Sequence, residues 1–315
     1  MKVETILYEL VAGIAMATLC ACSGDSRLGK PQCIGEPYDV ALTADDKELE
    51  RMAAGMFSEP MKALPQQETP FKTRVIDGIN DATRYFRTIV VVKKSQQDTK
   101  IKYEKNSFAK GQLMIVVATP SAEALRTDSQ KVAKTLQRLI DNHEMKMAIS
   151  HDAKSHNAAL MKTIDETLGC KITIPADMTM WKTGKGFVWI SDDGQKTMRN
   201  LCIYATKGIR TDAKSLADIR DSVMAANIKG EHDGMYMATE RRTGLLFSHD
   251  GNSMTMRGLW QMKGDAMGGP FVSRTIIDST RNRTVTAEAF IYAPATSKAR
   301  AMKRLESILY TIKLR

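Results

Sequence analysis

The chain has 315 residues, of which 43% are hydrophobic and 26% are charged, and its formal net charge at pH 7 is +10. This composition excludes an intrinsically disordered chain, because the apolar side chains are numerous enough to build a core. The length fits one large domain or two smaller ones.

The first 21 residues (1–21) are predicted to be a lipoprotein signal peptide. Lys2 supplies a positive charge, and an apolar stretch over residues 6–19 follows it. This stretch is too short and too interrupted to span a bilayer, which needs about 20 continuous apolar residues. Its length suits the apolar region of a secretory signal. Glu4 and Glu9 count against a signal, and an N-terminal core helix is the alternative interpretation.

Cys22 is predicted to carry a lipid. Leu19 and Ala21 precede it at the −3 and −1 positions, which resembles the aliphatic and small residues of a bacterial lipobox. The thiol of Cys22 would then take a diacylglyceryl group. Because each buried methylene contributes about 0.8 kcal/mol, two or three acyl chains hold a protein on a membrane lastingly. An ordinary signal peptide cut by a different peptidase is the alternative.

Residues 22–35 are small, polar and contain glycine and proline, so they are predicted to be a tether. Residues 36–168 are predicted to form an N-terminal half in which strands and helices alternate. Gly169 ends the last helix of this half. The expected strands are 38–43, 88–94, 100–105 and 112–119, and the expected helices are 45–56, a long helix around 132–147, and 155–168.

Residues 169–315 are predicted to form a C-terminal half that is richer in strands. Its first helix, 213–226, has Asp212 or Thr211 as the N-cap. Its last helix has Ser297 as the cap, continues through Ile312 and has an apolar face. The expected strands are 171–175, 186–191, 200–206, 235–240, 244–249, 253–263, 270–278 and 283–293.

Hairpins and helices in mixed order predict an α+β fold with mostly antiparallel sheets and flanking helices. Three apolar strands that end in alanine each lead into a helix, at 115–120, 202–207 and 290–294. This pattern would make the two halves similar through an internal repeat, although any strand that enters a helix through a turn has it. The boundary is predicted near residue 169, and the halves are free to pack as one body.

Three cysteines remain once Cys22 carries the lipid, namely Cys33, Cys170 and Cys202. Cys170 and Cys202 lie next to or within neighbouring predicted strands, so they are the best-placed pair for a disulfide in an oxidising envelope. Two buried thiols are the alternative.

No catalytic residue, metal site or cofactor motif is predicted. Three His-Asp pairs could ligate metal, but His232-Asp233 and His249-Asp250 run directly into glycine, which favours a tight turn. His151-Asp152 lies between two predicted helices, and the histidines do not cluster. No nucleophile elbow, phosphate-binding loop or dinucleotide fingerprint occurs. The basic residues form several clusters without a recognition motif, so no nucleic-acid partner is predicted.

The most distinctive segment contains Arg257, Trp260 and Gly268-Gly269-Pro270. The glycines permit either a positive φ or a close backbone approach. With a cation and a large aromatic face nearby, the segment could be a binding loop for an anionic or sugar-like ligand or for a partner. The alternative is a demanding turn, with Trp260 in the core and Arg257 paired to a carboxylate. Glu288, on a late strand, would need a cation if its face were covered, and Arg257 or Arg274 could supply it.

Several short motifs together resemble a known family. They are Leu64-Pro65-Gln66, Pro70-Phe71, Phe86-Arg87-Thr88-Ile89, Arg257-Gly258-Leu259-Trp260, Met267 to Ser273, Ala293-Pro294 and Leu305 to Leu309. Over about residues 36–315 the chain is similar to the domain of unknown function 4837, a group of Bacteroidota lipoproteins. The resemblance implies a lipoprotein with one family-wide fold unit, and it implies no catalytic residues. Because only Asp25 is acidic directly after Cys22, a periplasm-facing position is expected rather than surface export.

The sequence therefore predicts a non-enzymatic envelope lipoprotein, held on the membrane by its lipid, that binds another envelope protein or an acidic polymer. The alternative is a hydrolase or transferase that acts on cell-envelope material, with residues 257–273 near its site. A scaffold that recruits a protein through an exposed edge strand is a third hypothesis.

Overall fold

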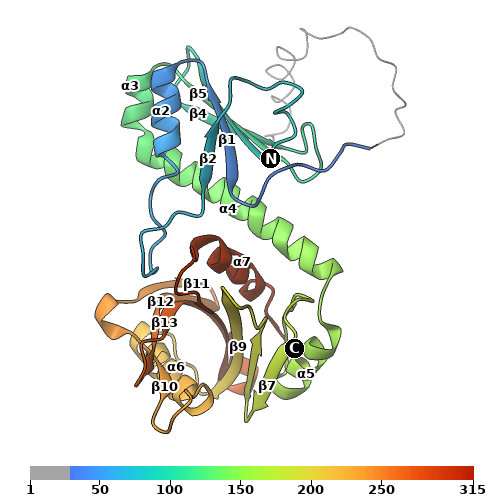
Figure 1. The fold of residues 1–315 in the computed structure, drawn as a ribbon, viewed down its shortest axis with the longest axis vertical. Helices are drawn as coiled ribbons and strands as arrows, with labels where there is room; N and C mark the ends of the chain where they lie inside the picture. The colour runs from blue at the N-terminus through green and yellow to red at the C-terminus, as the bar shows by residue number, and fades with distance from the viewer. Residues whose placement is uncertain (1–28) are drawn as a thin grey trace.

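The computed structural model describes residues 29–315, so the predicted signal peptide and Cys22 lie outside the described residues. Within this range no helix has the length and apolarity needed to cross a bilayer. The described chain forms two halves, and the long helix α4 (Ser129–Lys154) leads from the first half to the second (Figure 1).

The first half is built on a five-stranded mixed sheet with the order β2-β1-β3-β5-β4. β1 pairs in parallel with β2 and β3, β3 pairs in parallel with β5, and β4 alone is antiparallel. Parallel neighbours need long connections, and the segments between these strands supply them. The strands are β1 (Asp39–Ala44), β2 (Lys72–Val75), β3 (Thr88–Lys94), β4 (Lys100–Lys105) and β5 (Leu113–Thr119).

Three helices cover one face of this sheet: α2 (Lys47–Gly55), α3 (Ala122–Thr127) and α4. Asp46 begins α2, because its carboxylate accepts hydrogen bonds from the backbone N–H groups of Glu48 and Leu49, each at 2.9 Å. The apolar side chains of these helices and strands form one core, which includes Leu42, Leu49, Val90, Ile115, Leu136 and Ile140.

The second half contains an eight-stranded antiparallel sheet with the order β10-β12-β13-β14-β9-β8-β7, and β11 also pairs with β12. It confirms the predicted α+β class with antiparallel sheets and flanking helices. The strands are β7 (Met180–Gly184), β8 (Phe187–Ser191), β9 (Met198–Lys207), β10 (Tyr236–Thr239), β11 (Leu246–Asp250), β12 (Ser253–Lys263), β13 (Gly268–Asp278) and β14 (Arg283–Tyr292). A separate pair, β6 (Cys170–Lys171) and β15 (Lys313–Leu314), lies beside it.

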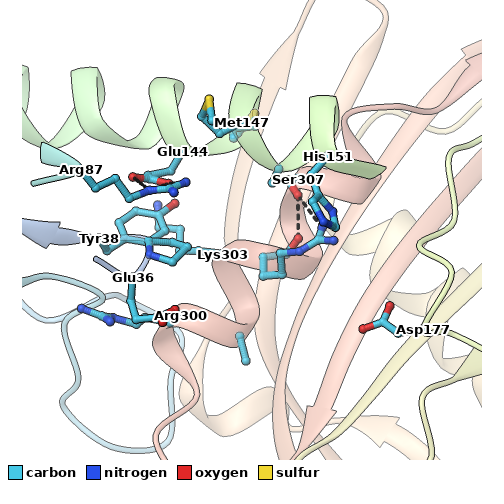
Figure 2. Close-up of a pocket in the computed structure, with 15 residues that line it drawn as sticks. Glu36, Tyr38, Arg87, Glu144, Met147, His151, Asp177, Arg300, Lys303 and Ser307 are labelled. Carbon is cyan, nitrogen blue, oxygen red and sulfur yellow. Dashed lines mark hydrogen bonds and ion pairs between the residues drawn. The ribbon is translucent and has the colours of Figure 1, made fainter. Parts of the chain in front are cut away.

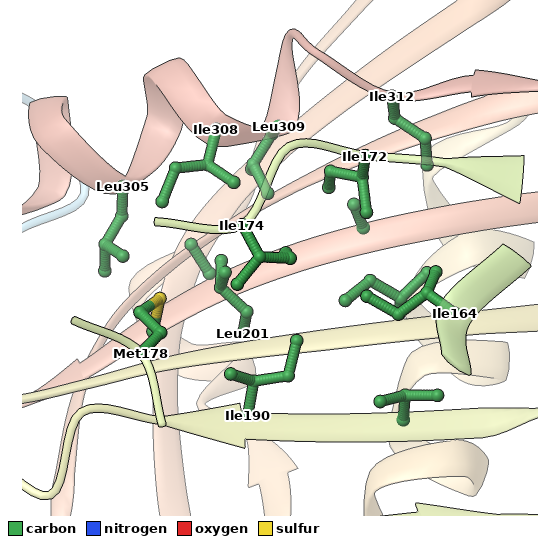
Figure 3. Close-up of a cluster of buried hydrophobic side chains, with 14 of the residues drawn as sticks. Ile164, Ile172, Ile174, Met178, Ile190, Leu201, Leu305, Ile308, Leu309 and Ile312 are labelled. Carbon is green, nitrogen blue, oxygen red and sulfur yellow. The ribbon is translucent and has the colours of Figure 1, made fainter. Parts of the chain in front are cut away.

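Helices pack on both faces of the second sheet. α5 (Ala158–Leu168) and α7 (Ala299–Leu309) cover one face, where Leu305, Ile308 and Leu309 meet Leu201 and Ile190 (Figure 3). α6 (Ala213–Asn227) covers the other face. Successive residues of β9 alternate between the two cores, as the two-residue period of a strand requires.

The predicted disulfide between Cys170 and Cys202 is not formed, and both thiols are free. Cys170 belongs to the core under α5 and α7, whereas Cys202 belongs to the core under α6. The sheet lies between the two sulfurs, so Cys170 and Cys202 are two separate buried thiols. Burial raises the pKa of both thiols, that of Cys170 to about 11.

The division between the two cores lies before α5 rather than at residue 169. Leu160, Ile164 and Leu168 of α5 are all buried in the core of the second half. The two halves also differ in topology, because one sheet is mostly parallel and the other antiparallel. The idea of two similar halves therefore finds no support in the strand order.

Candidate functional site

Arg257, Trp260 and Gly268-Gly269-Pro270 lie on the paired strands β12 and β13 rather than on a binding loop. Arg257 forms an ion pair with Glu306 of α7. Trp260 is 3% exposed, and its indole Nε1 donates a hydrogen bond to the carbonyl of Ile291 at 3.2 Å. Trp260 therefore lies in the core and Arg257 is paired to a carboxylate, as the second of the two interpretations from sequence expects.

The two glycines allow backbones to approach closely. A Cβ on Gly268 would lie 2.8 Å from the carbonyl oxygen of Trp260, and a Cβ on Gly269 would lie 2.1 Å from that of Ile291. Neither glycine has a positive φ. Of the two reasons for glycine that the sequence suggested, a positive φ and a close backbone approach, the close backbone approach therefore explains Gly268 and Gly269.

The His-Asp pairs are not brought together. Gly234 and Gly251 follow two of the pairs with φ of +84° and +56°, as expected of turns. In the third pair, Asp152 is buried and bound to Arg304 of α7, while the His151 side chain is exposed. Across residues 29–315 no group of three or more His, Cys, Asp or Glu side chains is placed to hold a metal ion.

A cleft of about 590 Å³ lies between the two halves, with α4 on one side and α7 on the other (Figure 2). Its lining combines apolar surface with charged groups. The apolar part includes Tyr38, Met145 and Met147, and the cations are Arg87, Arg300, Lys303 and Arg304. A volume of this size is typical of sites for small ligands.

Three of the cleft cations come from one face of α7. Arg300, Lys303 and Arg304 are spaced by three and four positions, so they project together from the helix. Each meets an aspartate of the first half. Arg300 reaches Asp39 at 2.8 Å, Lys303 reaches Asp141 at 2.8 Å, and Arg304 binds both carboxylate oxygens of Asp152.

α7 begins at a carboxylate from the other half of the molecule. Glu68 accepts hydrogen bonds from the Ser297 hydroxyl at 2.7 Å and from the N–H groups of Lys298 and Ala299 at 2.6 and 3.0 Å. Burial opposes ionisation of Glu68, but these hydrogen bonds outweigh it and hold the pKa below its usual value. The segment 57–71 thereby fixes the start of the helix that carries the cations.

Arg87 and Glu144 form a bidentate ion pair in the cleft. Arg87 Nε and Nη2 donate to the two carboxylate oxygens of Glu144 at 2.8 and 2.7 Å, and the Glu144 side chain is only 2% exposed. Figure 2 shows this pair beneath α4, close to Tyr38 and Lys303. Such a bidentate pair fixes the position of both groups.

Tyr38 lies between the two halves with an unusual backbone. Its φ is +68°, a conformation that bulky residues rarely adopt, although its side chain is buried and touches Phe71 edge-on. Burial, reinforced by the carboxylates of Asp141 and Glu144, raises the pKa of Tyr38 far above its usual range. The hydroxyl therefore keeps its proton at neutral pH and can donate a hydrogen bond. Strained residues of this kind gather at functional sites.

The sequence contains a basic cluster around Arg300 and Arg304, but nothing in it indicated the cleft. The spacing of three and four positions on a predicted helix was a usable signal for one charged face. The aspartate partners Asp39, Asp141 and Asp152 stand far away in sequence, without any local sign of their role. Tyr38 offered no signal, because a strained backbone cannot be read from residue type.

Two families match the chain, one for each half. Residues 33–151 match Domain of unknown function (DUF8532), and residues 157–311 match Domain of unknown function (DUF4837). The second half is a DUF4837 domain. The resemblance read from the sequence is confirmed for this half, while the motifs before α5 lie within the DUF8532 match. The cleft is thus formed where the DUF8532 region meets the DUF4837 domain. No curated protein matches the chain.

Some solved structures show a distant likeness. The Saccharomyces cerevisiae Ran-binding protein Mog1p is 10% identical over 46% of this chain and 90% of its own, with a TM-score of 0.32. A point mutant of Mog1 is 9% identical with the same coverage and TM-score. A Bacteroides thetaiotaomicron protein is 17% identical over 47% of this chain and 45% of its own, with a TM-score of 0.26. At such scores these likenesses have no bearing on function.

Proposed function

We propose that this protein is a lipid-anchored envelope protein that binds an amphiphilic, acidic ligand in the cleft between its two halves without transforming it. The single observation that carries the proposal is the placement of three cations of α7, Arg300, Lys303 and Arg304, beside apolar walls in one cleft. A ligand with an apolar body and an acidic group would satisfy both parts of this lining.

The cations retain donors for such a ligand. A guanidinium has five N–H donors, and Arg300 uses Nε for the carbonyl of Pro70 and Nη2 for Asp39. Within the described residues, Nη1 of Arg300 and Nε of Arg304 have no hydrogen-bond partner. The aspartates that hold these side chains also pre-orient them, which lowers the entropic cost of binding.

The non-enzymatic part of the proposal is supported by the state of the cleft acids. Of the three acids that line the cleft, Glu144 is clamped by Arg87 and Asp177 is bound to Arg199 at 2.6 Å, while Glu36 is exposed. A hydrolase would instead need a carboxyl or imidazole bonded to a nucleophile. In this cleft the Ser307 hydroxyl donates to the Arg304 carbonyl at 2.7 Å, and the His151 imidazole faces Asp152. Arg257 and Trp260, which the enzymatic alternative would place at the site, do not line this cleft.

The cleft is tested by filling it. The anionic amphiphile 8-anilinonaphthalene-1-sulfonate serves as the probe, and its fluorescence reports binding. We expect saturable binding to the wild type and at least about tenfold weaker binding when Ala148→Trp and Ala301→Trp occupy the cleft, since both alanines line it. Ala159→Trp, on an exposed position of α5, is the matched control and should bind like the wild type.

Equal probe binding by the filled variant would contradict the cleft as the site. A cationic amphiphile of similar size should bind more weakly than the anionic probe, because three of the lining cations lie together on α7. If the cationic probe binds as well, the preference for acidic ligands is wrong.

The anchor is tested separately in cells that process lipoproteins. Metabolic labelling with a palmitate analogue should mark the wild type, because the thiol of Cys22 is the predicted acceptor. Cys22→Ser should lose the label and move from the membrane to the soluble fraction. Cys33→Ser is the control and should keep both the label and the membrane location. An unlabelled wild type would overturn the lipid anchor but leave the cleft proposal standing.

A further inference from the structure

One edge of the first half is strongly basic. β4 is the last strand of its sheet and pairs only with β5, so its other side is open. Lys100, Lys102 and Lys105 of β4 are exposed, as is Lys110 in the loop that follows. We call these four lysines the basic edge. Between them Tyr103 is 51% exposed.

We propose that the basic edge lies against the anionic headgroups of the membrane on which the protein is anchored. This inference rests on the proposed lipid anchor, and it adds a second contact that orients the body. An acyl anchor alone lets a protein rotate freely, whereas several lysines near an anionic surface favour one face.

The lysines of the basic edge are available for an external partner. None of the four forms an ion pair with a carboxylate of residues 29–315, and Lys100 donates only to the amide oxygen of Gln97. Lys94, at the end of the neighbouring strand β3, is by contrast paired with Asp46 at 3.0 Å. Charges without an internal partner are the ones that respond to an outside field.

The loop that presents Lys110 is held by several hydrogen bonds. Asn106 adopts a φ of +58°, and its side-chain oxygen accepts from the Gly111 N–H at 2.7 Å. Gln112 is buried, accepts from the Phe108 N–H and donates to the backbone carbonyls of Arg84 and Phe86, just before β3. The lysines on either side of this loop are therefore held in a fixed arrangement before they meet a surface.

The root of the tether is bonded directly to this loop. The Lys110 N–H donates to the Pro31 carbonyl at 2.7 Å, and the Cys33 N–H donates to the Lys110 carbonyl at 3.0 Å. The ammonium of Lys30 donates to the carbonyl of Asn106 at 2.6 Å. A lipid on Cys22 would be nine residues from Pro31, a length of chain that can span at most about 32 Å. The anchor thus brings this loop, rather than the second half, to the membrane.

Protection of an edge strand is the simpler use of lysines, because charge on an open edge prevents pairing with another strand. That use requires lysines on β4 itself. Here the cations continue beyond the strand to Lys110 and Lys30, where no edge needs protection. The exposed Tyr103 adds a residue type that is enriched at membrane–water interfaces. These two features favour a membrane surface.

The test uses the chain from residue 22 onward with Cys22→Ser, so that only the folded body contributes to binding. It is titrated with vesicles of phosphatidylcholine that contain either none or about 30% phosphatidylglycerol, at about 50 mM salt. Each lysine near an anionic bilayer strengthens binding about fivefold. We expect at least tenfold tighter binding to the anionic vesicles, and loss of that difference when all four lysines are replaced by glutamine.

A matched control separates position from net charge. Lys171, Lys185, Lys229 and Lys263 are exposed on the second half, and their replacement by glutamine removes the same total charge. This control should retain most of the binding. Two pairs, Lys100→Gln with Lys102→Gln and Lys105→Gln with Lys110→Gln, keep the test decisive if the fourfold variant does not fold.

Three results would overturn the inference. They are equal binding of the wild-type body to both vesicles, equal losses for the two fourfold variants, and binding to soluble polyglutamate without binding to anionic vesicles. Because this body carries no lipid, its failure to bind would leave the anchor and the cleft untouched. A failed palmitate experiment with retained vesicle binding would instead remove the anchor and the orientation of an anchored body, but not the affinity of the basic edge for anionic lipid.

Discussion

Replacing Glu288 by alanine should lower the free energy of unfolding by about 3–5 kcal/mol. Glu288 and Arg220 of α6 form an ion pair in which both side chains are fully buried, with Nη2 2.7 Å from Oε1. The guanidinium also donates to Thr239 at 2.9 Å and stacks on the Phe271 ring at 3.8 Å. Without Glu288 a positive charge would remain in an apolar core without its partner. Urea denaturation monitored by circular dichroism measures the loss.

The exposed pair Lys162–Glu166 on α5 provides the control, and Glu166→Ala should change the free energy of unfolding by less than about 0.5 kcal/mol. Replacing both buried partners, with Arg220→Met and Glu288→Leu, should recover most of the loss, since no charge is then left alone. A double variant as unstable as Glu288→Ala would show that packing, rather than an unpaired charge, causes the effect.

Gly269→Ala should destabilise the protein by about 3 kcal/mol. Its Cβ would lie 2.1 Å from the carbonyl oxygen of Ile291 and 3.1 Å from the indole Nε1 of Trp260. Relief would require β13 and β14 to move apart and would break the hydrogen bond from Trp260 to Ile291. Urea denaturation gives the free energy, and the emission of Trp260 should shift to the red as the indole becomes hydrated.

Gly55, at the end of α2, serves as the matched glycine, because a Cβ there would meet nothing within 4 Å. Gly55→Ala should leave the stability unchanged or raise it by up to about 1 kcal/mol. Should Gly269→Ala cost no more than Gly55→Ala, the close backbone approach would not be the reason for this glycine.

Much of the local structure was predictable because it depends on neighbouring residues. The strand expected over 253–263 has those bounds, and the helix expected over 213–226 spans Ala213–Asn227 with Asp212 as its N-cap. The N-cap of the last helix, by contrast, could not be predicted from neighbouring residues. Ser297 was expected to cap it, but Glu68 from the other half does so. A cap supplied from so far along the chain leaves no local pattern.

The ion-pair partners of the buried charged side chains could not be predicted from the sequence. Glu288 was expected to need a cation if its face were covered, and that requirement is correct. Its partner is Arg220 of α6, however, not Arg257 or Arg274. Arg257 instead pairs with Glu306. Which cation meets which carboxylate depends on helix placement over the sheet, and several cations were equally suitable by residue type.

The sequence by itself determined most of the elements, the α+β class and the apolar face of the last helix, since periodicity and turn residues act over a few positions. It did not indicate the short elements β2, α3 and β15. Only the tertiary structure decided that the first sheet is mostly parallel, that Cys170 and Cys202 face different cores, and that α7 turns its cations toward α4. Strand order and ion pairs depend on contacts between residues that are remote in sequence, such as Asp152 and Arg304. Many oppositely charged residues could pair by their chemistry, and the path of the chain in space decides which of them meet.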